Sequence, residues 1–124
     1  MGENKEYIMH PDEKGSINIS EEVIAAIAAN AATEIEGVSG LYVSTSKEFA
    51  DLLGKKNATK GVKITTEGDL VTVDISILVK FGFAVSETAK NVQGAVKTEI
   101  ESATGLEVKA VNVTVNGVVF DKDK

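Results

Sequence analysis

The chain has 124 residues, enough for one domain of ordinary size and too few for two well-buried ones. Hydrophobic residues make up 43% and charged residues 26%, which is typical of a soluble globular domain rather than a disordered or membrane-embedded chain. All thirteen basic residues are lysines, and nineteen acids give a net charge of -6. Without arginine, and with a field that repels phosphates, we expect neither nucleic-acid binding nor direct membrane insertion.

The rarest residue types limit the chemistry further. The chain has no cysteine, which excludes disulfides, thiolate metal sites and cysteine nucleophiles. Its one histidine, His10, lies in a polar N-terminal stretch outside any periodic segment, where it cannot complete a catalytic triad or a zinc site. The sequence shows no signal peptide and no apolar run of about 18 residues. We therefore expect a cytoplasmic protein with no catalytic residues, no metal and no cofactor.

The N-terminal part of the chain predicts a lead-in, a strand and a helix. Residues 1–14 are charged and contain the only proline, which indicates a flexible lead-in. Residues 15–19 alternate apolar and polar like a strand, and Ser20 then caps a helix predicted to run to about residue 36. Its apolar residues recur every three or four positions, and Gly37 ends it. A second strand is predicted over residues 38–43.

The next segment, residues 44–63, has a local charge opposite to that of the whole chain. It contains five lysines and two acids, so it carries +3 while the rest of the chain carries -9. Ser46 predicts a short helix that continues to Leu53. A basic loop in an acidic protein can bind an acidic partner or a second copy, or it can simply be solvated. The candidate partner-binding residues here are Lys55, Lys56, Asn57, Lys60 and Lys63.

The C-terminal half predicts a hairpin, a helix and a strand. Alternating residues over 62–67 and 71–80 indicate two strands joined at Gly68-Asp69. A helix follows from Ser86 to about residue 104, and Gly94 within it predicts a close packing contact. The last strand is expected over residues 107–115. Asn116-Gly117 then predicts a turn, with residues 118–120 as a short return strand.

This order of elements predicts an α+β fold of two layers. Two helices cover one face of a mostly antiparallel or mixed sheet, in the order strand, helix, strand, hairpin, helix, strand. We expect one domain over residues 15–120 and a charged tail over residues 121–124. The other face is left to solvent or to a partner. Asp74 lies on that face. It could take part in acid-base chemistry if a second carboxylate lay across the sheet, or it could be a solvated charge. We add it to the candidate partner-binding residues.

Several runs resemble the alkaline shock protein family of Gram-positive bacteria. They are residues 36–41, 52–62, 104–108 and 111–113, together with Phe81-Gly82, and the resemblance extends from about residue 15 to residue 115. It implies a cell-envelope stress response protein with no established enzymatic activity and with no catalytic residues to transfer. It also implies a cytoplasmic protein that can be held at the membrane by a related anchor protein.

The residues and the resemblance together predict a scaffold rather than an enzyme. We expect a homo-oligomer that docks to a membrane-anchored partner through the uncovered sheet face and the loop from Lys55 to Lys63. The alternative is a small-ligand binding module for an anionic envelope-related molecule, with the loop acting as a lid. A deep apolar pocket with converging polar groups would favour that alternative.

Overall fold

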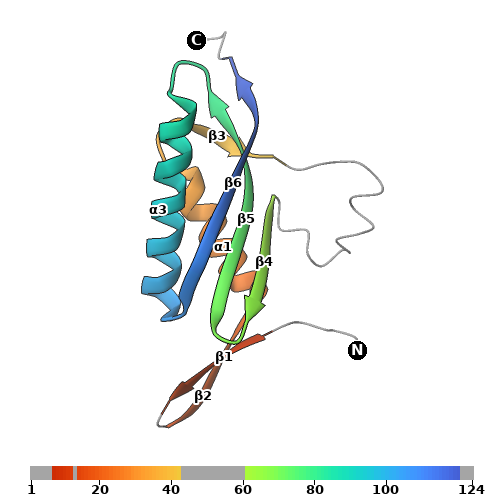
Figure 1. Cartoon of the computed structure of the whole chain (residues 1–124), viewed down its shortest axis with the longest axis vertical. Helices are drawn as coiled ribbons and strands as arrows, with labels where there is room; N and C mark the ends of the chain where they lie inside the picture. Colours follow the sequence, from red (N-terminus) through yellow and green to blue (C-terminus); the bar gives the residue numbers. More distant parts are fainter. Residues whose placement is uncertain (1–6, 13, 43–60, 121–124) are drawn as a thin grey trace, which may run out of the picture.

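The structure is a computed structural model that describes residues 7–12, 14–42 and 61–120 (Figure 1). Within these ranges two helices and six strands follow one another along the chain. They are β1 (Tyr7–Asp12), β2 (Gly15–Ser20), α1 (Glu21–Thr33), β3 (Val38–Leu41), β4 (Val62–Glu67), β5 (Leu70–Lys80), α3 (Val85–Thr104) and β6 (Glu107–Val119).

Strand β5 is the centre of a four-stranded sheet. Strand β6 pairs with it in parallel along its whole length, from Leu70 to Lys80. Its other edge is shared end to end by two antiparallel partners, because β4 pairs with residues 70–75 and β3 with residues 77–79. The α3 helix makes the crossover between the parallel strands, as such a connection requires. The predicted α+β fold with a mixed sheet is therefore confirmed.

The core lies between one face of this sheet and the two helices. Alternate residues of β5 are buried, as the period of two predicted, and the same face receives the apolar stripes of both helices. Figure 1 looks onto the opposite face, with α1 behind the strands. The largest fully buried side chains are Ile24, Val71, Val73, Ile75, Ile77, Val79, Val92, Val96 and Ile100, so the core is aliphatic.

The helix ends follow from local chemistry. The hydroxyl of Ser20 accepts a hydrogen bond from the Val23 amide at 3.3 Å, which caps α1 as predicted. The helix ends at Thr33, earlier than residue 36, because the chain tightens into successive turns before β3. Gly37 leaves these turns at φ +101°, and a Cβ there would lie 2.9 Å from the Phe83 ring. The absence of a side chain at Gly37 therefore allows the α1–β3 turn to pack closely against Phe83 and Thr88 near the start of α3.

The first strand, β1, lies within residues 1–14, for which the sequence predicts a flexible lead-in. β1 pairs antiparallel with β2, from Tyr7 opposite Ser20 to Asp12 opposite Gly15. This pair forms a separate two-stranded sheet, which projects from the lower end of the molecule in Figure 1. The ordered hairpin thus begins before Gly15, and Pro11 is accommodated within a strand of a two-stranded ribbon, where only one side of the strand is paired.

The predicted turn at Asn116-Gly117 is wrong. β6 continues without reversal to Val119, and Asn116 is an extra residue where the register steps from Ile77 opposite Val115 to Leu78 opposite Gly117. The dipeptide therefore makes a β-bulge, because β5 extends to Lys80 and offers a partner for the whole strand. Residues 118 and 119 continue β6 instead of forming a return strand.

The expected packing contact at Gly94 is also absent. A Cβ at this position would meet nothing within 4 Å, and the residue is exposed. No contact among the described residues explains why a glycine interrupts the middle of α3.

Candidate functional site: the uncovered face of the sheet

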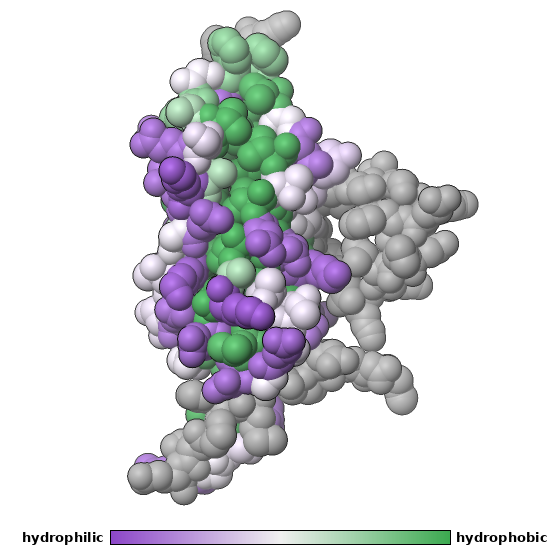
Figure 2. Space-filling model, in the orientation of Figure 1, coloured by the Kyte–Doolittle hydropathy of each residue, from purple (hydrophilic) through white to green (hydrophobic). Residues whose placement is uncertain are grey.

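The face of the sheet opposite the helices carries polar side chains on three neighbouring strands. We call it the open face and define it by Lys63, Thr65, Glu67, Thr72, Asp74, Ser76, Lys109, Asn112 and Thr114. These positions alternate with the core residues of the same strands, so the strand period directs them away from the helices. In Figure 2 hydrophilic side chains gather on the lower half of this face, and hydrophobic ones form a band toward its upper end.

Asp74 lies in the middle of the open face. Its Oδ1 accepts a hydrogen bond of 2.9 Å from Nδ2 of Asn112, the residue opposite it on β6. On its other side the Cα partner of Asp74 is Lys63 of β4. The residues opposite Asp74 on the two neighbouring strands therefore carry an amide (Asn112) and an ammonium group (Lys63), and neither carries a second carboxylate. This arrangement favours the interpretation of Asp74 as a charge on the solvated face over the carboxylate-pair chemistry.

A second polar contact spans the open face near its lower end. Nζ of Lys109 lies 3.8 Å from Oε1 of Glu67, although β5 separates their strands. Lys109 can reach across because it is the extra residue where the β5–β6 register shifts between Val71 and Thr72. The pair is exposed, so its electrostatic contribution to stability is small.

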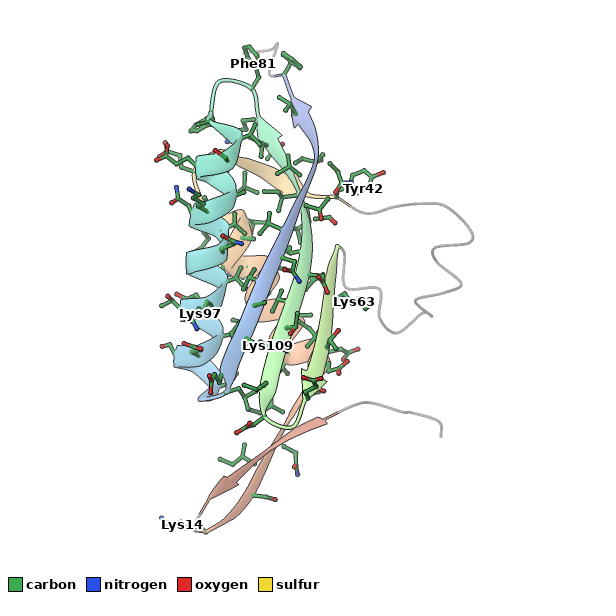
Figure 3. The ribbon with its side chains drawn as sticks, viewed as in Figure 1. Lys14, Tyr42, Lys63, Phe81, Lys97 and Lys109 are labelled. Carbon is green, nitrogen blue, oxygen red and sulfur yellow. The ribbon has the colours of Figure 1, made fainter. Side chains whose placement is uncertain are left out.

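The basic segment begins and ends at one point beside the open face. The amide of Tyr42 donates to the Ser76 carbonyl at 2.9 Å, and the Ser76 amide donates to the Gly61 carbonyl at 3.0 Å. Tyr42 and Gly61, which flank residues 43–60, are therefore held together by one residue of β5. Figure 3 shows Tyr42 and Lys63 near this point.

Gly61 is required at this junction. Its φ is +83°, and a Cβ there would lie 2.7 Å from the carbonyl oxygen of Tyr42. A side chain would push apart the two ends that Ser76 joins. The junction is thus built from backbone groups, and it anchors the positive segment at the edge of the sheet.

The structure brings together only part of the predicted set. Lys63 and Asp74 lie opposite each other on adjacent strands of the open face. Lys55, Lys56, Asn57 and Lys60 lie outside the described residues, as does the short helix predicted from Ser46.

A further cluster, whose residues are not among the predicted site residues, joins α3 to β6. Nε2 of Gln93 donates to the Val111 carbonyl at 2.9 Å, and Nζ of Lys97 donates to the Val108 carbonyl at 3.3 Å. Oε2 of Glu101 accepts from the Val108 amide at 2.9 Å and lies 3.0 Å from Nζ of Lys97. The hydrogen bond from the Val108 amide, and then the Lys97 ammonium, hold the pKa of Glu101 below its ordinary value of 4.5. The spacing of these residues along α3 is a visible signal, but it fits a solvated helix face equally well.

Apolar side chains gather at the upper end of the molecule. The rings of Phe81 and Phe120 stack with centroids 4.6 Å apart, yet 65% and 60% of their surfaces remain exposed. The Phe81 amide donates to the Val119 carbonyl at 2.8 Å, which ties the end of β5 to the end of β6. Figure 3 shows Phe81 at this end.

The described ranges hold neither a cluster of metal-ligating residues nor a membrane-spanning helix. Nowhere in residues 7–12, 14–42 and 61–120 do three or more histidine, cysteine, aspartate or glutamate residues gather as a possible metal site. Over the same ranges, neither helix is long and apolar enough to span a membrane.

Comparison with known proteins identifies the family. Residues 9–120 match the model of the alkaline shock protein 23 family, described as having a cell envelope-related function. The chain belongs to this family, as the sequence resemblance predicted. It is 38% identical to the uncharacterized protein YloU of Bacillus subtilis over 84% of this chain and 88% of that protein. It is 37% identical to the uncharacterized protein Spy1614 of Streptococcus pyogenes, with the same coverage.

A weaker likeness exists among solved structures. The MamM CTD matches 77% of this chain and 93% of its own length, at 16% sequence identity and a TM-score of 0.47.

Proposed function

We propose that this protein works without catalysis, as a cytoplasmic scaffold of the cell-envelope stress response. In this proposal it associates with itself and docks to a membrane-anchored partner. The surface that it uses is the open face together with the loop from Lys55 to Lys63, which lies in the basic segment of residues 44–63.

One observation carries the proposal. The positive segment has a charge of +3 against -9 elsewhere, and its two ends meet at the Tyr42–Gly61 junction, on the border of a face that neither described helix covers. The two ends of this segment therefore lie beside a polar surface, and the positive charge of its sequence suits an acidic partner surface. The family's envelope-related description and the hydrogen bond from the Asn112 amide to Asp74 support a role in contact rather than chemistry.

The test reverses charge within the basic segment. Lys55→Glu with Lys56→Glu is compared with Lys14→Glu with Lys90→Glu, a control that changes the net charge equally at exposed sites elsewhere. Each protein is crosslinked in cells of the native host, with and without alkaline or wall stress. Captured proteins are identified by mass spectrometry, and oligomer size is measured on purified protein.

The first variant should lose partner capture, while the control keeps it. Equal capture by both variants would show that the basic segment plays no part. Recovery of a small anionic envelope precursor with the purified wild-type chain, and no protein partner, would favour the ligand-binding alternative instead.

A further inference from the structure

Strand β6 is a long edge strand, and side chains of α3 hydrogen-bond to the backbone of its first half. It has 13 residues and pairs with β5 alone among the described strands, so its other side presents backbone groups without a strand partner. Exposed strand edges of this kind are templates for pairing with another chain. In the first half the side chains of Gln93, Lys97 and Glu101 bind the backbone of Val108 and Val111. The beginning of this edge is thus closed by α3.

Among the described residues, the side-chain hydrogen bonds from α3 reach Val108 and Val111 and do not extend to the second half of the β6 edge. Figure 1 shows α3 beside the beginning of β6, and the strand leans away from the helix further up. The sequence from Ala110 to Phe120 contains no charged residue, in a chain where 26% of residues are charged. Natural edge strands usually carry a lysine or another charge that prevents pairing. Here none is present, and Val118, Val119 and Phe120 are exposed.

The direction of the free backbone groups follows from the Gln93 contact. The Val111 carbonyl points away from β5, because it accepts the hydrogen bond from α3. In an extended strand the backbone groups alternate sides with a period of two. Val113 and Val115 therefore also direct their N–H and C=O groups outward, before the bulge at Asn116 changes the phase. Thr114 lies between them, with its exposed side chain on the open face.

We propose that a second copy of this chain pairs with this edge, β6 against β6 in antiparallel orientation, about a two-fold axis at Thr114. Val113 of one copy then lies opposite Val115 of the other, and each such pair exchanges both backbone hydrogen bonds. The two Thr114 side chains meet directly across the axis, which is a favourable cross-strand pair. The sheets of the two copies become one. This rests on the self-association in the proposed function and gives it a specific interface.

Charge and symmetry favour a second copy as the occupant. A chain with net charge -6 repels its copies, and the uncharged stretch from Ala110 to Phe120 is where two copies approach with least repulsion. A two-fold interface places like residues against like, which an uncharged threonine and valine segment tolerates. The edge of β4 is a poorer partner, because it is six residues long and carries Lys63 and Glu67.

The first experiment uses charges at the axis. Thr114→Lys and Thr114→Glu each place like charges together in a homodimer, and should weaken it at least about tenfold in sedimentation equilibrium of the full chain. Mixing the two variants places opposite charges together and should restore the dimer as a heterodimer. Thr65→Lys and Thr65→Glu are matched controls, since Thr65 is exposed on the same face but belongs to β4. Circular dichroism of each variant confirms folding.

The second experiment exploits the absence of native cysteine. Thr114→Cys should form a disulfide-linked dimer under mild oxidation, and Thr65→Cys should remain uncrosslinked. If the Thr114 variants keep the wild-type association constant, or if Thr65→Cys crosslinks equally, the proposed interface is wrong. Loss of association only in the basic-segment variant would overturn this interface and leave the proposed function standing. A wild-type chain that is monomeric at all concentrations would overturn self-association itself.

Discussion

Replacing Gly94 by alanine should stabilise the protein. Gly94 lies in the interior of α3, is exposed, and leaves open space where a Cβ would be. Alanine is favoured over glycine inside a helix by about 1 kcal/mol, because glycine loses more backbone freedom on folding. No packing term offsets this gain. The expected increase in the free energy of unfolding is therefore about 1 kcal/mol, or roughly 3 °C in Tm for a domain of this size.

Gly68 provides the matched control for this prediction. A Cβ at Gly68 would also meet nothing within 4 Å, but the φ of this glycine is +65° in the turn between β4 and β5. Alanine there should destabilise the protein by about 1–2 kcal/mol, because an L-residue is strained in this region. Urea unfolding of Gly94→Ala and Gly68→Ala, followed by circular dichroism, measures both changes. A Gly94→Ala protein no more stable than wild type would refute the reasoning from helix propensity.

Three further changes test other features. Glu101→Gln should lower the free energy of unfolding at pH 7 and lower it much less at pH 3. Because the pKa of Glu101 is lowered in the folded state, the ionised carboxylate stabilises the fold above about pH 4.5, and this contribution is lost as the pH falls through the lowered pKa. Urea unfolding midpoints at both pH values measure the difference, and a difference that does not change with pH would contradict the prediction. Gly61→Ala should lower the free energy of unfolding by about 1 kcal/mol or more, because alanine is strained at a positive φ and its Cβ would lie too close to the Tyr42 carbonyl. An unchanged urea midpoint would argue against a tight junction. Ile77→Ala should cost about 2–5 kcal/mol by leaving a cavity, and a thermal-unfolding loss below about 1 kcal/mol would show that the core relaxes there.

Sequence periodicity predicted the layers of the fold because the core is regular. The alternation in β5 and the stripes of α1 and α3 each show one apolar face, and those faces meet in the core. Periodicity failed at Asn116-Gly117, where the dipeptide suits both a hairpin turn and a bulge. The outcome there depends on whether a partner strand continues alongside, and the distant residues Leu78 to Lys80 decide it.

The candidate surface was predictable in part for the same reason. Strand alternation placed Asp74 on the uncovered face, but its neighbours Lys63 and Asn112 depend on the pairing register of three strands. The closure of the β6 edge by Gln93 and Glu101 depends on how α3 lies against the strand. The first arrangement leaves no local signal in the sequence, and the helical spacing that underlies the second fits a solvated helix face equally well.

The junction at Ser76 also bears on how such a chain can diversify. Because Tyr42 and Gly61 bind the same residue of β5, the intervening segment enters and leaves the sheet at a single point. Lengthening a flexible loop between fixed ends costs only about 0.6 kcal/mol for each doubling of its length. Insertions, deletions and new sequences can therefore be exchanged at this site while the sheet and its core stay intact. The length and sequence between Tyr42 and Gly61 are thus largely uncoupled from the stability of the sheet.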